Sequence, residues 1–138
     1  MKLILAALAD YTSITQEGKL NILGIFDTIH SKEFPLHYPN PMQLVLKFEF
    51  SATDDDIGKE QICTVVLQDE DGKRILTING AVTPPNPPPG EILTTQIILD
   101  LKGVPFRRPG RYEFAIMIKD KEVWNLPLKV VKASPKKA

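Results

Sequence analysis

Residues 108–118 read RPGRYEFAIMI, and this stretch decides the fold. Its Pro-Gly pair predicts a turn. The residues after the turn place apolar side chains at alternate positions, as in a β-strand with one face buried. The predicted inward side chains are Tyr112, Phe114, Ile116 and Ile118. Tyr112 lies near the start of this strand.

Seven further segments have the composition of strands, and no stretch has a convincing helical period. They are Leu3–Asp10, Leu20–Ile29, Met42–Phe50, Gln61–Gln68, a hairpin partner ending near Val82, Leu93–Leu101 and Glu122–Val131. Thr12–Lys19 is polar and is expected to be a loop. The inward residues are expected to include Cys63 and Trp124. The pattern predicts an all-β fold, an antiparallel β-sandwich of about eight strands.

The stretch around Tyr112 resembles the tyrosine corner of Greek-key sandwiches, which implies an immunoglobulin-like domain or a close relative. The resemblance also implies that the Tyr112 hydroxyl bonds back to the preceding loop. Two features depart from that family: the chain has one cysteine, and its only tryptophan falls in the last strand. A second resemblance covers most of the chain. Leu8–Tyr11, Gly18–Asp27, Asp69–Gly72 and Pro109–Phe114 are similar to short bacterial proteins catalogued as a domain of unknown function. That resemblance implies a bacterial single-domain protein and assigns no site.

Length and composition restrict the class of protein. The 138 residues suit a single domain, expected over residues 1–132, with a flexible lysine-bearing tail at residues 133–138. Equal numbers of basic and acidic residues, 17 each, argue against a nucleic-acid partner. No apolar run reaches the roughly 18 residues of a membrane span. One cysteine excludes an internal disulfide and is compatible with the cytoplasm.

The first nine residues, MKLILAALA, are open to two interpretations. They have the order of a very short signal peptide, and they also have the composition of a buried first strand. We favour the strand, because a secretory signal needs roughly 15–30 residues.

Successive loops of a sandwich alternate between its two ends. This alternation is expected to place Ser31–Pro41, Asp69–Lys73, Gly103–Pro109 and both termini at one end, which would be basic. The opposite, acidic end would hold Thr12–Lys19, Thr53–Gly58 and Thr83–Gly90. The candidate interaction surface lies at the basic end and comprises His37, Tyr38, Phe106, Arg107 and Arg108, since aromatic and arginine side chains are common at binding hot spots. Tyr38 or Phe106 can instead plug the end of the core.

The remaining motifs favour structural roles. Asp54–Asp56 is expected to be a solvated acidic loop, with calcium binding as the less favoured interpretation. Pro84–Pro89 contains P-x-x-P but joins two strands, so a rigid connector is favoured over a polyproline ligand. His30 and His37 lack further metal ligands nearby in sequence. No nucleophile, phosphate-binding or zinc motif is present, and we expect no catalytic residue, metal or cofactor.

The sequence therefore predicts a non-enzymatic protein-interaction or self-association module with an unidentified protein partner, a homodimer being favoured. An exposed strand edge is a second place for that contact. The alternative is a small-ligand or carbohydrate module with a pocket at one end of the sandwich. Calcium-dependent membrane binding is a third and weaker hypothesis, and we expect no membrane partner.

Overall fold

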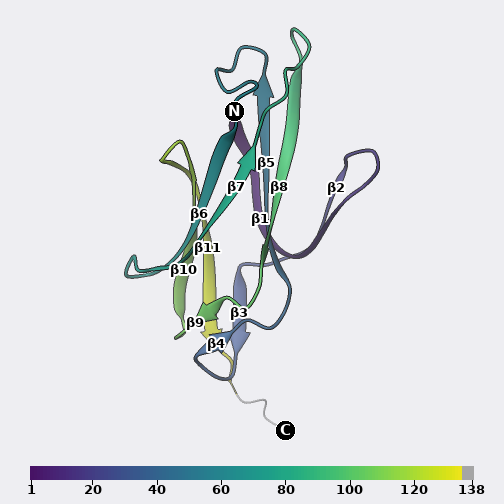
Figure 1. The fold of residues 1–138 in the computed structure, drawn as a ribbon. Helices are drawn as coiled ribbons and strands as arrows, with labels where there is room; N and C mark the ends of the chain where they lie inside the picture. The colour runs from purple at the N-terminus through teal and green to yellow at the C-terminus, as the bar shows by residue number, and fades with distance from the viewer. Residues whose placement is uncertain (135–138) are drawn as a thin grey trace.

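The computed structural model describes residues 1–134, which form two antiparallel sheets packed face to face (Figure 1). The first sheet has the order β2-β1-β5-β8, made of Leu20–Ile25, Lys2–Ile14, Met42–Ser51 and Ile92–Leu101. The second has the order β3-β11-β10-β6-β7, made of Thr28–Ser31, Lys121–Lys132, Gly110–Ile118, Gln61–Asp69 and Arg74–Val82. The short strands β4, Leu36–His37, and β9, Pro105–Phe106, pair at one end. Among the described strands, β3 and β11 are the one pair that runs parallel.

The core lies between the two sheets and follows from the alternation of apolar residues. On β5, Leu44, Leu46 and Phe48 are fully buried, and on β10 so are Phe114 and Ile116. These side chains face each other across the sandwich, since strand residues two apart point to the same face. The predicted all-β antiparallel sandwich is confirmed. The immunoglobulin-like type stays a prediction, as do the domain bounds, and tail residues 135–138 lie outside the described part of the chain.

The expected tie between Tyr112 and the preceding loop is present. The Tyr112 hydroxyl donates a hydrogen bond of 2.6 Å to the carbonyl oxygen of Arg108. The Tyr112 ring is buried and meets Phe106 edge-to-face, with ring centroids 5.0 Å apart. Burial raises the pKa of Tyr112, although the bond to Arg108 opposes that shift. The hydroxyl therefore remains a hydrogen-bond donor at neutral pH.

Replacing Tyr112 by Phe is expected to lower the free energy of unfolding by about 1 kcal/mol, because only the hydroxyl and its bond to Arg108 are lost. Urea denaturation measures the change. Tyr11→Phe is the matched control, since Tyr11 is exposed. Equal stability of the two variants would show that the hydroxyl of Tyr112 does not fix the corner.

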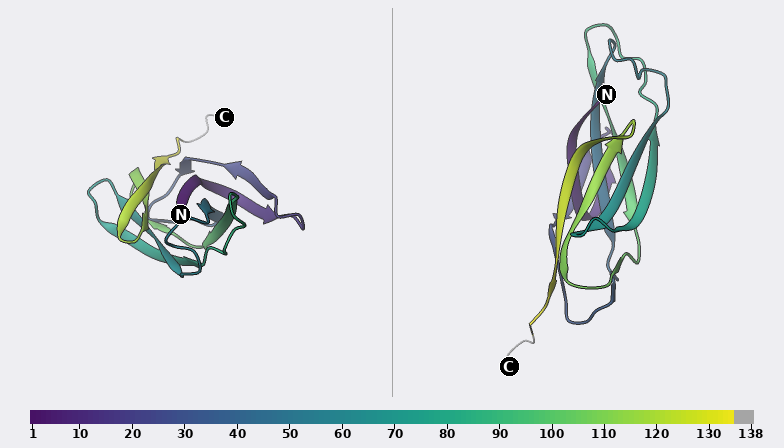
Figure 2. Two further views of the ribbon diagram at one scale, coloured as in Figure 1. Left: turned by 90° about the horizontal axis from the view of Figure 1, so that it is seen from above. Right: turned by 90° about the vertical axis from the view of Figure 1, so that its left-hand side faces the viewer.

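The first two strands differ from the prediction, because Thr12–Lys19 is not a loop throughout. The strand β1 continues to Ile14, and β2 returns along it in antiparallel register, with Tyr11 opposite Leu23. The strand β5 accompanies β1 only as far as Ala9. Residues 10–25, which we call the arm, therefore form a hairpin that projects from the side of the sandwich (Figures 1 and 2).

This hairpin also corrects the expected position of the N-terminus. The predicted second strand, Leu20–Ile29, is divided between β2 in one sheet and β3 in the other. Neither β2 nor β3 runs from one end of the sandwich to the other. The chain therefore crosses the sandwich one time fewer before β5 than predicted. The N-terminus consequently lies at the acidic end, where the Met1 amino nitrogen is 3.0 Å from Asp56 Oδ2. The loops after β5 lie at the ends that the alternation predicts (Figure 1).

Trp124 was predicted to point into the core, and this prediction is wrong. The residue is 54% exposed and does not belong to the core. It is opposite Ile116 in the register of β10 and β11. However, β3 covers β11 only from Lys129 onward, so Trp124 lies on an open sheet edge. Cys63, by contrast, is buried as expected.

Candidate functional site

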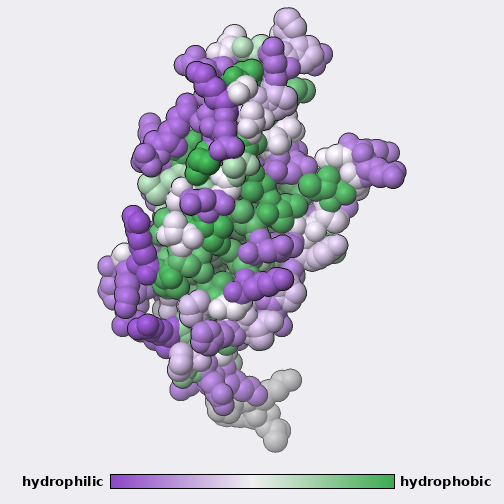
Figure 3. Space-filling model, viewed as in Figure 1, coloured by the Kyte–Doolittle hydropathy of each residue, from purple (hydrophilic) through white to green (hydrophobic). Residues whose placement is uncertain are grey.

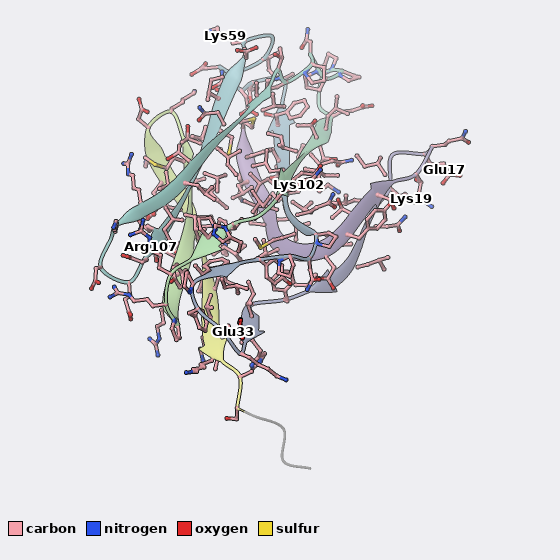
Figure 4. The ribbon with its side chains drawn as sticks, turned by 60° about the horizontal axis from the view of Figure 1, so that its bottom comes forward. Glu17, Lys19, Glu33, Lys59, Lys102 and Arg107 are labelled. Atoms are coloured by element: carbon pink, nitrogen blue, oxygen red, sulfur yellow. The ribbon has the colours of Figure 1, made fainter. Side chains whose placement is uncertain are left out.

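The structure brings together the two loops that carry the predicted interaction surface. In the pairing of β4 with β9, His37 is opposite Pro105, and the Tyr38 amide donates a 3.0 Å hydrogen bond to the carbonyl of Val104. Figure 4 views this end of the molecule, with Arg107 and Lys102 on the chain that flanks β9. The loops before β5 and before β10 thus form one continuous surface.

Phe106 is not part of that surface. Its side chain is fully buried, packed against Tyr112 and opposite Leu36. Tyr38 is half-buried, with its ring centroid 6.3 Å from that of Phe26. Of the five predicted residues, His37, Arg107 and Arg108 are therefore exposed, Tyr38 is partly exposed, and Phe106 closes the end of the core. The pairing of β9 with β4 explains this result, because it sets Phe106 opposite Leu36 with its ring against Tyr112.

Arg108 is held by acidic residues of the neighbouring β6–β7 turn. Its Nη2 atom lies 2.6 Å from Asp71 Oδ2 and 4.0 Å from Asp69 Oδ2. The bond to Asp71 raises the pKa of the guanidinium above its usual value. Asp69 is already engaged, since its Oδ1 accepts the amides of Asp71 and Lys73. Arg108 thus joins the tyrosine corner to this turn.

A pocket of about 380 Å³ lies beside this ion pair. Its lining comprises Asp69, Asp71, Lys73, Arg74, Ile75, Pro105, Arg107, Arg108 and Tyr112. Three of its four cationic groups, those of Lys73, Arg74 and Arg107, have no carboxylate within 4.0 Å among the described residues. The pocket is therefore positively charged, and it has the size of a small-molecule site.

At the acidic end, the loop Asp54–Asp56 differs from the predicted solvated loop. Asp56 is buried, and its Oδ1 accepts a 2.9 Å hydrogen bond from Lys119 Nζ. Asp54 Oδ2 accepts the Ser51 amide at 2.7 Å and lies 3.5 Å from the Met1 amino nitrogen. The carboxylates of Asp54 and Asp56 thus bond to groups of the protein itself. Over residues 1–134, no three His, Cys, Asp or Glu side chains are grouped closely enough to hold a metal ion.

The bond from Lys119, followed by the Met1 amino group, lowers the pKa of Asp56 below its ordinary value of 3.8. Because the folded pKa is the lower one, this contribution to stability is complete above pH 3.8 and is lost as the pH falls through the folded value. We expect Asp56→Asn to lower the free energy of unfolding by roughly 1 kcal/mol at neutral pH, since Lys119 is largely solvated. Thermal unfolding across acidic pH checks this, and a gap between variant and parent that does not narrow on acidification would contradict it.

The thiol of Cys63 has no features of a nucleophile. Burial raises its pKa to about 11, so it is protonated at neutral pH. His30 and His37 are both exposed and lie on different strands, β3 and β4.

The arm is the surface that the sequence analysis missed. The structure has ten exposed large apolar side chains among the described residues, and six of them belong to β1 or β2. Four lie in the arm: Tyr11, Ile14, Leu23 and Ile25, with 50–66% of each side chain exposed. The sequence contains a signal for this hairpin, because the Gly-containing segment Thr15–Lys19 lies between two runs of strand-forming residues.

Comparison with known proteins shows the family. The chain is similar to the β-glucosidase of Listeria innocua in complex with isofagomine, with a TM-score of 0.49 and 11% identity, over 92% of this chain and 16% of the enzyme. The complex of the same enzyme with glucose matches with a TM-score of 0.47 and 10% identity, over 76% of this chain and 15% of the enzyme. The chain thus spans about a sixth of these enzymes.

No curated protein matches the sequence. Among the described residues, no helix has the length and apolar character needed to cross a membrane. Residues 4–131, nearly the whole chain, match the family described as "Family of unknown function (DUF6941)". The chain therefore belongs to this family of unknown function, DUF6941.

Proposed function

We propose that this chain is a non-enzymatic, cytoplasmic protein-interaction module and that the arm is its binding surface. The observation that carries the proposal is the exposure of Tyr11, Ile14, Leu23 and Ile25 on a hairpin that leaves the sandwich. An isolated two-stranded hairpin is at best marginally stable in water. Beyond Ala9 the arm has only its own two strands, so a partner would supply the missing apolar contacts.

The distribution of polarity agrees with this assignment. In Figure 3 hydrophobic surface covers the middle of the body and continues to the base of the arm, whereas the tip of the arm and the lower end of the sandwich are hydrophilic. The tip carries Glu17 and Lys19, whose charged groups lie 3.3 Å apart and largely neutralise each other (Figure 4). No other charged residue lies between Tyr11 and Ile25. Depletion of charge is characteristic of the centre of protein interfaces.

Site-specific photo-crosslinking in the native cells tests the proposal. A photoreactive p-benzoylphenylalanine at position 23 should give a covalent protein adduct, identified by mass spectrometry. The matched control is the same residue at position 62, where Ile62 is also exposed and apolar but lies on the other sheet. Absence of an adduct from position 23, or equal adducts from both positions, would overturn the arm as the binding surface.

A second candidate function is the binding of a small anion in the basic-end pocket. The specific observation is that Lys73, Arg74 and Arg107 line one pocket and, among the described residues, form no ion pair with its two carboxylates, Asp69 and Asp71. A carbohydrate is disfavoured, because the aromatic residue of the lining, Tyr112, is buried. Calorimetric titration with inorganic pyrophosphate tests this function. Binding that is weakened by Arg107→Ala and unaffected by Lys102→Ala, outside the pocket lining, would support it, and the absence of binding would exclude it.

A further inference from the structure

The connection between β7 and β8 is a proline-rich segment that the proposed function does not use. Residues 83–91 read TPPNPPPGE, so five of the six residues 84–89 are prolines. Proline fixes φ at about −65°, and a residue that precedes a proline is restricted to extended conformations. The peptide bonds of this segment are trans, and its one positive φ is that of Gly90. These restraints favour a polyproline II helix, which has three residues per turn.

The burial of the prolines follows this period of three residues. Pro84 and Pro87 are buried, whereas Pro85 and Pro88 are exposed. Residues three apart lie on the same face of a polyproline II helix. One face is therefore packed against the protein, and Pro85 and Pro88 lie together on the outside. We call these two exposed residues the proline ridge.

Both ends of the segment are fixed by backbone hydrogen bonds. The Pro84 carbonyl accepts the Gly58 amide at 2.9 Å, which joins the segment to the loop after β5. The Pro88 carbonyl accepts the Glu91 amide at 3.0 Å and closes a turn in which Gly90 has a φ of 80°, as in type II. In Figure 1 the segment stands at the upper end of the molecule, above β8. A ridge held in this way loses little conformational freedom on binding.

The chemistry of the proline ridge specifies the groups that would bind it. Proline has no N–H, so the one backbone donor of residues 84–89 is that of Asn86. The carbonyl groups of Pro85 and Asn86 accept no backbone hydrogen bond among the described residues. A complementary surface therefore presents apolar area together with hydrogen-bond donors. Tyrosine and tryptophan side chains supply both, a ring for the pyrrolidine and an O–H or N–H for the carbonyl.

The charges beside the proline ridge are mainly acidic. In residues 53–60 and 83–91, the exposed charged residues are Asp55, Glu60 and Glu91 against one cation, Lys59. None of these four forms an ion pair among the described residues. A partner would therefore match this surface with basic groups around its contact.

From this shape, hydrogen bonding and charge, we infer that the proline ridge is a further interaction site and that its partner is a protein domain with an aromatic-lined groove and a basic rim. Such grooves bind proline-rich segments that are already extended before binding. The role as a rigid connector and the role as a ligand are compatible, because Pro84 and Pro87 serve the first and Pro85 and Pro88 the second. The inference is independent of the arm.

Photo-crosslinking in the native cells tests the site. p-Benzoylphenylalanine at position 86, beside the ridge, should give a covalent protein adduct, identified by mass spectrometry. The matched control is position 70, where Glu70 is exposed in the β6–β7 turn at the opposite end of β7. The double variant Pro85→Ala/Pro88→Ala should abolish the adduct. Pro89→Ala, which changes an exposed proline outside the ridge, should keep it.

Calorimetric titration of the purified chain with the cross-linked partner tests the mode of recognition. Pro85→Ala/Pro88→Ala should raise the dissociation constant by about tenfold or more, and Pro89→Ala by less than about twofold. Replacing the partner's tyrosine or tryptophan at the cross-link by Ala should cause a loss similar to that of the double variant. Binding should weaken between about 50 and about 500 mM NaCl, as expected for a basic rim facing acidic residues.

The variants are expected to keep the parent's melting temperature, because both altered prolines are exposed. If the double variant unfolds, Pro85→Ala alone should raise the dissociation constant by about threefold or more.

The outcomes separate this inference from the proposed function. No adduct from position 86, or equal adducts from positions 86 and 70, would overturn the proline ridge as a site, whatever position 23 gives. An adduct from position 86 with none from position 23 would support the ridge and overturn the arm. A partner that binds Pro85→Ala/Pro88→Ala as tightly as the parent, or that does not need its aromatic residues at the cross-link, would overturn recognition by an aromatic groove.

Discussion

Replacing Phe106 by Ala is expected to lower the free energy of unfolding by about 3–5 kcal/mol, the range for removing a buried aromatic side chain. Phe106 is fully buried at the end of the sandwich, and its ring packs edge-to-face on Tyr112 at 5.0 Å. The truncation would therefore leave a cavity next to the ring of Tyr112. Such a loss is a large fraction of the stability of an ordinary domain. Urea denaturation of the purified chain measures it.

The control for this prediction is the neighbouring residue. Arg107→Ala removes a large exposed side chain and is expected to change stability by less than about 0.5 kcal/mol. Phe106→Leu should recover much of the loss, because it refills part of the cavity. A destabilisation by Phe106→Ala of the same size as that by Arg107→Ala would mean that Phe106 does not plug the core and would return it to the interaction surface.

Replacing Gln43 by Leu is expected to cost about 2–3 kcal/mol and to loosen the arm. Gln43 Oε1 accepts hydrogen bonds from the amide and the hydroxyl of Thr12, at 2.7 and 2.5 Å, and its Nε2 donates to Asp100 at 2.6 Å. Thr12 is 6% exposed, so the substitution would leave two donors without a partner, which is costly in a buried position. The backbone pairing of β1 with β5 ends at Ala9 and Gln43. Beyond that point, the Gln43 side chain bonds to Thr12 in place of a neighbouring strand.

Two measurements check the role of Gln43. Urea denaturation gives the stability, and amide hydrogen exchange should become faster at residues 11–14 and 20–25 than in the parent. Gln96→Leu is the matched control, since Gln96 is opposite Lys47 on the same outer face and makes no side-chain hydrogen bond among the described residues. Unchanged exchange in the arm of Gln43→Leu would show that the arm is held by other contacts.

Part of the arrangement of the loops that carry the predicted interaction surface could be derived from the sequence. Counting strands after Met42 correctly placed the loops that carry His37 and Arg107 at one end, because each of those strands crosses the sandwich. Whether Phe106 points outward depended on β9, a strand of two residues that exists only because β4 lies beside it. A strand of that length has no period of its own that a sequence can show.

Trp124 and the arm show a related limit. Alternation along β11 put Trp124 on the inward face, yet its exposure depends on where β3 stops covering the edge. Similarly, the apolar residues of β2 have the pattern of a core strand, and they are exposed because β5 separates from β1 at Ala9. Burial is a property of the neighbours of a strand, which its own residues do not encode locally.

The sequence by itself determined the fold class, most of the strand boundaries after Met42, and the turn that brings Tyr112 against the preceding loop. These features rest on local rules, namely the two-residue period of a strand and the turn chemistry of Pro109-Gly110. Only the tertiary structure decided that residues 10–25 project as an arm, that Phe106 closes the core and that the edge of β2 is open. Those results depend on which strands pair and where the pairing ends, and that choice is made by contacts between residues far apart in the chain.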